Sequence, residues 1–278
     1  MIYLLILFSF LFSTDFNSQI SDSHDLDDGI DSTRSYKSPL QYAMYSAIIP
    51  GLGQYALSKK TSNKNFKNRS FYFLGVELLA FMTKNLFNSK YKDQKILYRT
   101  YADTNWDFGK WITDYNIFED SEDFSGLWEN PNGIYQGIGE SSHYIQFYYG
   151  EEQSLVRTTD DYFKDELKDN IMESYEQGDD IHSGEHSIRI SKDQHFYENI
   201  GKYNEFFTGW SDANLNNITI SQSNHGYNTP RSPIKNSYIA SYNKAEELSD
   251  YAEYAVWCIY FNHFVSMLDA FILANKFN

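Results

Sequence analysis

Residues 255–274 read AVWCIYFNHFVSMLDAFILA. Two of these 20 residues are Asp, Glu, Lys, Arg or His: His263 and Asp269. A helix of about 20 predominantly apolar residues crosses the hydrocarbon core of a bilayer, which is about 30 Å thick. The run therefore predicts a C-terminal membrane helix within residues 251–278.

Two other apolar segments lie nearer the N-terminus. Residues 39–57 (PLQYAMYSAIIPGLGQYAL) carry no charge, and residues 71–87 (FYFLGVELLAFMTKNLF) include Glu77 and Lys84. The Phe, Leu and Val side chains of the second segment favour insertion by about 4 kcal/mol in total, against about 2.5–3.5 kcal/mol for a central Glu. We therefore expect a mainly α fold with three short membrane helices. In an alternative arrangement, Pro50 and the glycines beside it bend the first segment into a re-entrant hairpin.

The charges between these segments are unevenly distributed. Residues 88–250 carry 29 Asp and Glu against 14 Lys and Arg, a net charge of −15. The connector between the first two segments has five basic residues and no acid: Lys59, Lys60, Lys64, Lys67 and Arg69. Short basic loops stay in the cytoplasm. The connector and the C-terminus are therefore expected inside, and the N-terminal tail and residues 88–250 outside.

The N-terminus begins with MIYLLILFSFLF, about a dozen nearly unbroken apolar residues. This length is typical of the apolar region of a signal peptide and too short to span a bilayer. We expect a signal peptide over residues 1–19 and a disordered acidic tail over residues 20–38; a short amphipathic or core helix is the alternative. The predicted location is the bacterial cell envelope, in the inner membrane, with residues 88–250 in the periplasm.

The overall composition excludes several functional classes. With a formal net charge of −15 and a pI near 4.8, the surface repels phosphate backbones, so nucleic acid is not an expected partner. The single cysteine, Cys258, excludes an intrachain disulfide and a cysteine zinc cluster. No P-loop, G-x-G-x-x-G or Ser-His-Asp order is present, so no cofactor is predicted.

Residues 88–250 are expected to form an external acidic helical domain with long loops and little strand. A helix is predicted over residues 160–177, and a capping box of Ser191 with Gln194 predicts the start of another. A further helix is expected to run from about Ser237 into the last membrane segment.

Polar side chains within the apolar segments are the first candidate site. Asn262, Ser266 and Asp269 recur at helical spacing on one face, with His263 beside them, and Glu77 is near the middle of another segment. Ionisable groups in lipid mark either a functional site or a pair that joins helices. Contacts between Glu77 and His263, or between Asp269 and Lys84, are predicted. Structural pairing is favoured over a proton or ion relay.

A second, weaker candidate is a metal site formed by His182, Glu185 and His186, with His195 nearby. The spacing is not H-E-x-x-H, and Gly184 indicates a loop. A solvated loop is the favoured interpretation, and no metal is predicted.

One motif carries a resemblance to a known family. Residues 46–55 read SAIIPGLGQY and are followed by two lysines; the matching stretches farther on are YAD at 101–103, NW at 105–106, YENIGKY at 197–203, GWSD at 209–212, NH at 262–263 and DA at 269–270. These stretches resemble an uncharacterised family of bacterial membrane proteins, a domain of unknown function, whose P-G-x-G-Q motif falls here on Pro50, Gly51, Gly53 and Gln54. The Asn-Gly that often follows the motif's Tyr is absent here. The resemblance implies an envelope protein and adds no reaction.

Three functions remain open. The first is a membrane-anchored envelope protein with a structural or interaction role, whose partners are the lipid bilayer and another envelope protein. The second is a membrane-embedded enzyme or ion- or proton-handling protein that uses Glu77, His263 and Asp269. The third is a soluble exported helical domain. An enzymatic role is the less favoured of these.

Overall fold

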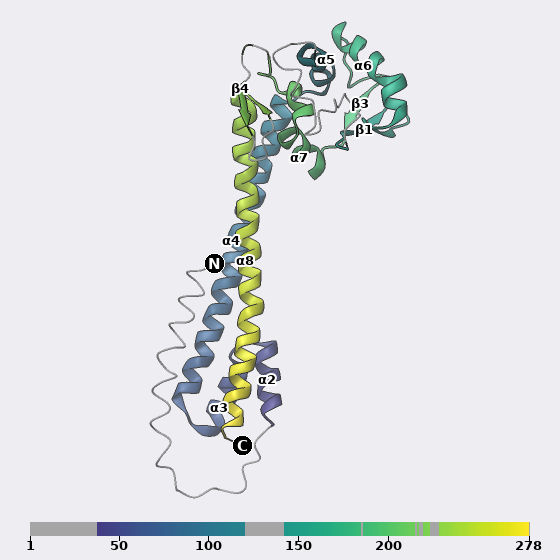
Figure 1. The fold of residues 1–278 in the computed structure, drawn as a ribbon. Helices are drawn as coiled ribbons and strands as arrows, with labels where there is room; N and C mark the ends of the chain where they lie inside the picture. The colour runs from purple at the N-terminus through teal and green to yellow at the C-terminus, as the bar shows by residue number, and fades with distance from the viewer. Residues whose placement is uncertain are drawn as a thin grey trace, which may run out of the picture. The chain divides into compact units, whose positions relative to one another are not determined.

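The computed structural model describes residues 38–119, 142–184, 186–214, 216, 219–222 and 228–277. The signal peptide and most of the acidic tail expected before Ser38 lie outside these residues. The described chain is mainly helical (Figure 1). Its elements in order are α2 (Pro39–Ile48), α3 (Leu52–Thr61), α4 (Lys64–Asn105), α5 (Phe108–Glu119), β1 (Gln146–Tyr149), β2 (Ser154–Arg157), the π-helix η2 (Phe163–Leu167), α6 (Lys168–Glu176), β3 (Ile188–Ile190), α7 (Gln194–Lys202), the 3₁₀ helix η3 (Asn204–Gly209), β4 (Thr219–Gln222), β5 (Asn228–Arg231) and α8 (Pro233–Asn275).

The chain divides into two units. Unit 1 combines Met1–Ser89 with Leu248–Asn278, and unit 2 is Lys90–Glu247. The sequence predicted an external domain over residues 88–250. Helices α4 and α8 each contribute residues to both units.

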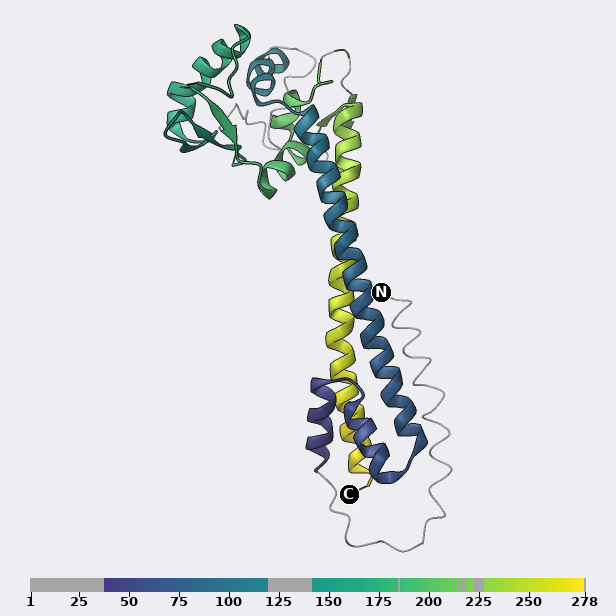
Figure 2. The same ribbon diagram turned by 180° about the vertical axis from the view of Figure 1, so that it is seen from behind.

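In unit 1, residues 39–57 are divided between two short helices, α2 and α3. Pro50 has no backbone N–H to continue a helix, and Gly51 takes the left-handed conformation with φ at +90°. Gly53 allows close packing of α3 against α2, because a Cβ there would overlap the Tyr42 carbonyl oxygen. The same Cβ would lie 2.9 Å from the Cβ of Ala270, so the hairpin also packs on α8. Figure 2 shows α2 and α3 beside the C-terminal part of α8.

The apolar interior of unit 1 is small. One buried cluster joins the hairpin, the start of α4 and the end of α8, and it consists of Tyr42, Leu57, Phe66, Ala270, Leu273 and Ala274. Three of these six residues come from the last turns of α8. The short hairpin helices therefore depend on α8 for most of their apolar contacts.

The three expected membrane helices are corrected to one candidate span. Among the described helices, α8 alone is long and apolar enough to cross a membrane. Helices α2 and α3 have ten residues each, about 15 Å of length, so residues 39–57 do not form one spanning helix. Residues 71–87 lie within α4, but their mean hydropathy is too low for a candidate span because Glu77 and Lys84 offset the apolar side chains.

Unit 2 has a core of buried aromatic side chains. The indole N–H of Trp106 donates to the Phe206 carbonyl at 2.9 Å, and that of Trp210 donates to the Ile200 carbonyl at 3.0 Å. When the N–H of a buried indole is hydrogen-bonded, the ring adds apolar contact area at little desolvation cost. The core joins α4, α5, α7 and η3 within the unit, and Tyr238 extends it to α8.

Unit 2 also contains two small sheets of short strands, so the expectation of a mainly helical domain with little strand is confirmed. One sheet has the antiparallel order β2-β1-β3, with Phe147 opposite Val156 and Ile190; the other pairs β4 with β5. The strands have three or four residues each, too short for period-2 alternation to be distinguished in the sequence.

The capping prediction is wrong. The α7 N-terminus is capped by Asp193, whose carboxylate accepts from the Phe196 N–H.

Candidate functional site

The polar side chains of unit 1 form a hydrogen-bonded network, the first part of which joins α8 to α4. Glu77 accepts from the side-chain amide of Asn262 at 3.0 Å through one oxygen, and its other oxygen lies 3.2 Å from His263 Nε2. The same Asn262 amide donates to the Phe73 carbonyl at 3.0 Å. Asn262 is fully buried. These contacts fix the Glu77 carboxylate between two neighbouring side chains of α8.

His263 also contacts the hairpin. Its Nδ1 lies 2.8 Å from the carbonyl oxygen of Ala47 near the end of α2. A carbonyl oxygen can only accept a hydrogen bond, so Nδ1 carries the hydrogen. One imidazole ring therefore bridges α2 and α4 from its place on α8.

The second part of the network surrounds Asp269. Arg69 donates to one carboxylate oxygen at 2.6 Å, and the side-chain amide of Gln54 donates to the other at 2.9 Å. Arg69 and Asp269 are mostly buried, with side chains 19% and 13% exposed. A carboxylate at this depth is stabilised by pairing and hydrogen bonding. Both of its oxygens are used here, so the pair is structural.

The glycines and glutamine of the P-G-x-G-Q motif join the hairpin to α8. The backbone N–H of Gly51 donates to the Ser266 hydroxyl at 2.7 Å, and that of Gly53 donates to the Ser46 hydroxyl at 2.9 Å. Gln54 accepts from Ser46 and donates to the Ser266 carbonyl. The hairpin turn thus has its backbone groups satisfied by side chains from α2 and α8, as a buried turn requires.

The structure brings together all the polar candidates of the apolar segments. Of the two predicted contacts, Glu77–His263 is present, whereas Asp269 pairs with Arg69 in place of Lys84. Sequence reasoning assigned Arg69 only to the basic connector. No local signal in the sequence favours Arg69 over Lys84, because both are basic residues of α4 and the register of α4 against α8 selects the partner.

The surroundings of this network are apolar. In the described part of unit 1, fourteen large apolar side chains are more than half exposed: Leu40, Met44, Ile48, Phe71, Tyr72, Leu78, Leu79, Phe81, Met82, Leu86, Trp257, Tyr260, Phe264 and Ile272. In the described part of unit 2 there are three: Ile96, Leu97 and Leu155. Unit 1 therefore places its polar groups inside and its apolar groups outside.

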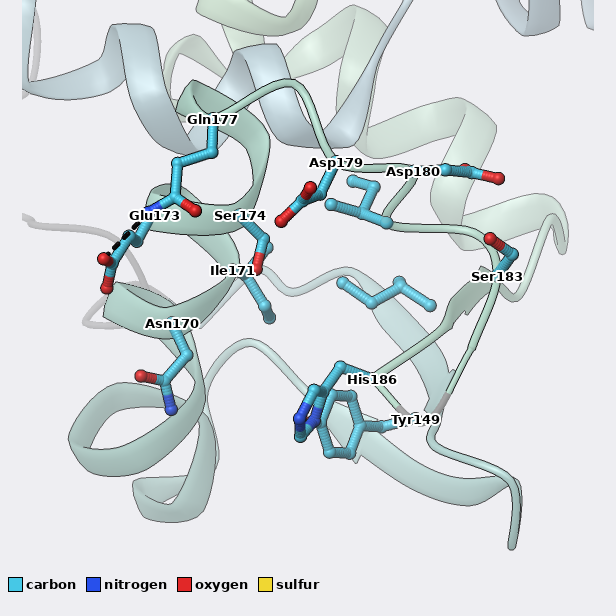
Figure 3. Close-up of a pocket in the computed structure, with 12 residues that line it drawn as sticks. Tyr149, Asn170, Ile171, Glu173, Ser174, Gln177, Asp179, Asp180, Ser183 and His186 are labelled. Atoms are coloured by element: carbon cyan, nitrogen blue, oxygen red, sulfur yellow. Dashed lines mark hydrogen bonds between the residues drawn. The ribbon is translucent and has the colours of Figure 1, made fainter.

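Unit 2 contains a separate polar cavity of about 510 Å³. Figure 3 shows His186 and Tyr149 together on one side of it, across from Glu173 of α6 and Gln177 at the end of that helix, which are hydrogen-bonded to each other. The Tyr149 hydroxyl lies 2.7 Å from His186 Nδ1. With Asp179 and Asp180 also on its wall, the cavity favours a cationic or hydroxyl-bearing ligand over an anionic one.

The weak metal candidate falls beside this cavity. His182 Nδ1 donates to the Ile188 carbonyl at 3.0 Å, and Glu185 lies outside the described residues. The His182 backbone N–H and the Ser183 hydroxyl lower the pKa of the exposed Asp180 carboxyl. Within the residues that the structure describes, no group of three His, Cys, Asp or Glu side chains has the geometry of a metal site.

Comparisons with protein-family models, with curated proteins and with solved structures give no match to this chain.

Proposed function

We propose that unit 1 lies in a lipid bilayer and that the chain is a membrane-anchored envelope protein with a structural or interaction role. The observation that carries this proposal is the inverted distribution of side chains in unit 1. Burying each large apolar side chain is worth about 1.5–3 kcal/mol, so water would oppose a surface of fourteen of them. Lipid would cover that surface without cost.

The burial of α8 supports the same proposal. Its most apolar 18-residue window is only 22% buried within the protein. The core helix of a water-soluble domain passes the same length and hydropathy test but is mostly buried, since only burial removes its side chains from water. Unit 1 has too few partner helices to cover this one.

The hairpin favours a re-entrant arrangement over three spans. Each of its helices is about 15 Å long, half of the hydrocarbon core. A hairpin that enters and leaves on one face puts Ser38 on the same side as the basic connector of Lys59 to Arg69. Helix α8 then crosses the bilayer, and the apolar part of α4, which falls short of a span on its own, crosses beside it because its Glu77 is hydrogen-bonded to Asn262 of α8. Residues 90–247 are then expected on the other side of the membrane from the basic connector. Under the positive-inside rule the shared side is the cytoplasm.

Membrane retention and cysteine labelling test the proposal. Carbonate-washed membranes are expected to retain the protein, and release without detergent would instead support a soluble exported domain.

In a Cys258→Ser background, Ser38→Cys and Lys64→Cys should react with an impermeant maleimide from one side, and Asp160→Cys from the other. Labelling of Lys64→Cys and Asp160→Cys from one side would contradict the topology. Labelling of Ser38→Cys opposite Lys64→Cys would favour a first segment that spans, as a cleaved signal peptide requires.

A second candidate function, proton or ion handling within the membrane, is favoured by one observation, the contact of Glu77 with His263. Substituting Glu77→Gln and Asp269→Asn separates the two functions. A structural role predicts lost stability alone. Proton or ion handling predicts a folded Glu77→Gln protein without that activity, measured as uptake into proteoliposomes.

A further inference from the structure

Both ring nitrogens of His263 face hydrogen-bond acceptors. Nδ1 is 2.8 Å from the Ala47 carbonyl oxygen, and Nε2 is 3.2 Å from a carboxylate oxygen of Glu77. A neutral imidazole carries one N–H and one lone pair. The Ala47 contact requires the hydrogen on Nδ1, which leaves the Nε2 lone pair directed at the carboxylate. The observed geometry is satisfied only when another proton lies between Nε2 and Glu77.

That proton can belong to either partner. An imidazolium can donate from Nε2 to the Glu77 carboxylate, or a protonated Glu77 can donate to the Nε2 lone pair. The two forms contain the same atoms, and each has one proton more than a neutral imidazole beside a carboxylate. When the proton leaves to water, two electron-rich groups remain face to face at a spacing that fits a hydrogen bond.

We propose that Glu77 and His263 form a proton-binding site, and that the bound proton fastens the α2–α3 hairpin to α4 and α8. His263 bridges the three helices through two hydrogen bonds, and the second exists only while the proton is bound. Loss of the proton turns the contact with Glu77 into a repulsion. The ring then moves and releases the Ala47 carbonyl.

Other charged side chains of the described part of unit 1 lie on the same helices as this pair, among them Asp269, Arg69 and Lys84. Asp269 has both oxygens occupied by Arg69 and Gln54, and Arg69 does not lose its proton in proteins. On α4, Lys84 is about two turns beyond Glu77 and has no ion pair among the described residues. The hairpin presents a carbonyl to His263 and no charged side chain.

The pair lies partly at the surface of unit 1. The side chains of His263 and Glu77 are 29% and 23% exposed, while Asn262 beside them is fully buried. Asn262 also holds Glu77 in place by donating to its other oxygen, so the carboxylate cannot turn away when the proton leaves. The site is therefore rigid and only partly enclosed. It goes beyond membrane anchoring, because the contacts that form it lie within the protein.

Nitrogen-15 NMR of the full chain in detergent, with labelled histidine, tests the proton directly. His263 is assigned from the spectrum of His263→Gln. We expect a hydrogen on Nδ1 throughout and a second proton shared at Nε2 that is present at the low end of the pH range compared and absent at the high end. Glu77→Gln, whose amide can donate permanently to Nε2, should hold His263 in the neutral Nδ1–H form throughout. A neutral His263 with its hydrogen on Nε2 would overturn the proposal.

Hydrogen exchange in residues 39–48 tests the fastening of the hairpin. The protection factors of the α2 amides are first corrected for the intrinsic pH dependence of exchange. In the wild type they should fall by about tenfold from the low to the high end of the pH range, which corresponds to the loss of roughly one hydrogen bond. Glu77→Gln should abolish this fall. Glu253→Gln, a matched change at an exposed glutamate of α8, should leave it intact. Equal pH dependence in the wild type and Glu77→Gln would show that the pair does not fasten the hairpin. Neither measurement depends on membrane insertion, so its result is separate from that of the extraction test.

Discussion

Units 1 and 2 place the same kinds of side chain in opposite positions. In unit 2, Trp111, Trp210 and Phe207 are at most 1% exposed, and Lys235 is the one charged side chain that is buried among the described residues. In unit 1, Trp257 and Leu79 are more than half exposed, whereas Gln54, Ser266 and Asn262 are fully buried. Unit 2 is held together by burial of apolar area, and unit 1 by hydrogen bonds within a polar interior.

The difference is the one expected if, as proposed, lipid surrounds unit 1 and water surrounds unit 2. In water, apolar burial is the main favourable term of folding, and a hydrogen bond contributes only about 0.5–1.5 kcal/mol net. Next to lipid, apolar side chains gain nothing by moving inside, and helices associate through small residues, close packing and polar contacts. The glycines and serines of the hairpin fit the second case.

Removing a tryptophan from the aromatic core should have the largest effect and separate the units. Trp210→Ala removes a buried ring that packs at a tilt against Tyr238, with centroids 4.8 Å apart, and should destabilise unit 2 by about 3–5 kcal/mol. Thermal unfolding followed by near-ultraviolet circular dichroism measures this change. Retention in carbonate-washed membranes should be unaffected, since unit 1 makes the membrane contacts. Joint loss of both properties would contradict the division of roles.

Placing a lysine on the exposed surface of each unit compares the surroundings of the two units directly. Leu79→Lys, at a side chain 64% exposed in unit 1, should oppose membrane insertion by about 2.5–3.5 kcal/mol. Leu155→Lys, at a side chain 52% exposed in unit 2, should change stability by at most about 0.5 kcal/mol. The measurements are the membrane-integrated fraction for both variants and thermal unfolding for both. Similar small effects at the two positions would mean that water covers both units.

Adding a methyl group to the hairpin tests how closely α2, α3 and α8 pack in unit 1. Gly53→Ala places a Cβ against the Tyr42 carbonyl and Ala270 and should destabilise unit 1 by about 1–3 kcal/mol. Gly75→Ala is the matched control on α4, where a Cβ would meet nothing within 4 Å, and its helix propensity should gain about 1 kcal/mol. Proteolysis of the detergent-solubilised chain can rank both variants against the wild type. A tolerated Gly53→Ala would contradict the close packing of α2 and α3.

A buried lysine predicts how the stability of unit 2 depends on pH. Lys235 is fully buried beside the Phe207 ring, and burial, helped by the charge of Arg231, lowers its pKa to about 7. The unfolded chain keeps this proton up to about pH 10. Stability should therefore rise with pH between about 7 and 10, with a slope of up to roughly 1.4 kcal/mol per pH unit.

Lys235→Met removes this contribution and provides the comparison. The variant should be more stable than the wild type at pH 7, and the difference should shrink toward pH 9. Denaturant titration at several pH values measures it. Above pH 10 tyrosines act in the opposite direction, since burial raises the pKa of Tyr242 to about 12. A constant difference across pH 7–9 would mean that Lys235 stays charged when folded.

The polar candidate residues of unit 1 were predictable because their spacing and their apolar surroundings are visible in the local sequence. Asn262, Ser266 and Asp269 share a face at helical spacing, and an ionisable residue in an apolar run is conspicuous wherever it falls. The partner of Asp269 was not predictable in this way. Lys84 and Arg69 are both basic residues of α4, and only the register of α4 against α8 decides between them.

By itself the sequence determined the helical character of the described chain, the apolar segments, the basic connector and the break at Pro50, because each depends on neighbouring residues. The tertiary structure decided that residues 39–57 form a hairpin, that three strands pair beside α6, and that polar groups lie inside unit 1. These features depend on contacts such as that of Gly51 with Ser266, 215 residues apart. No local period in the sequence encodes such a contact.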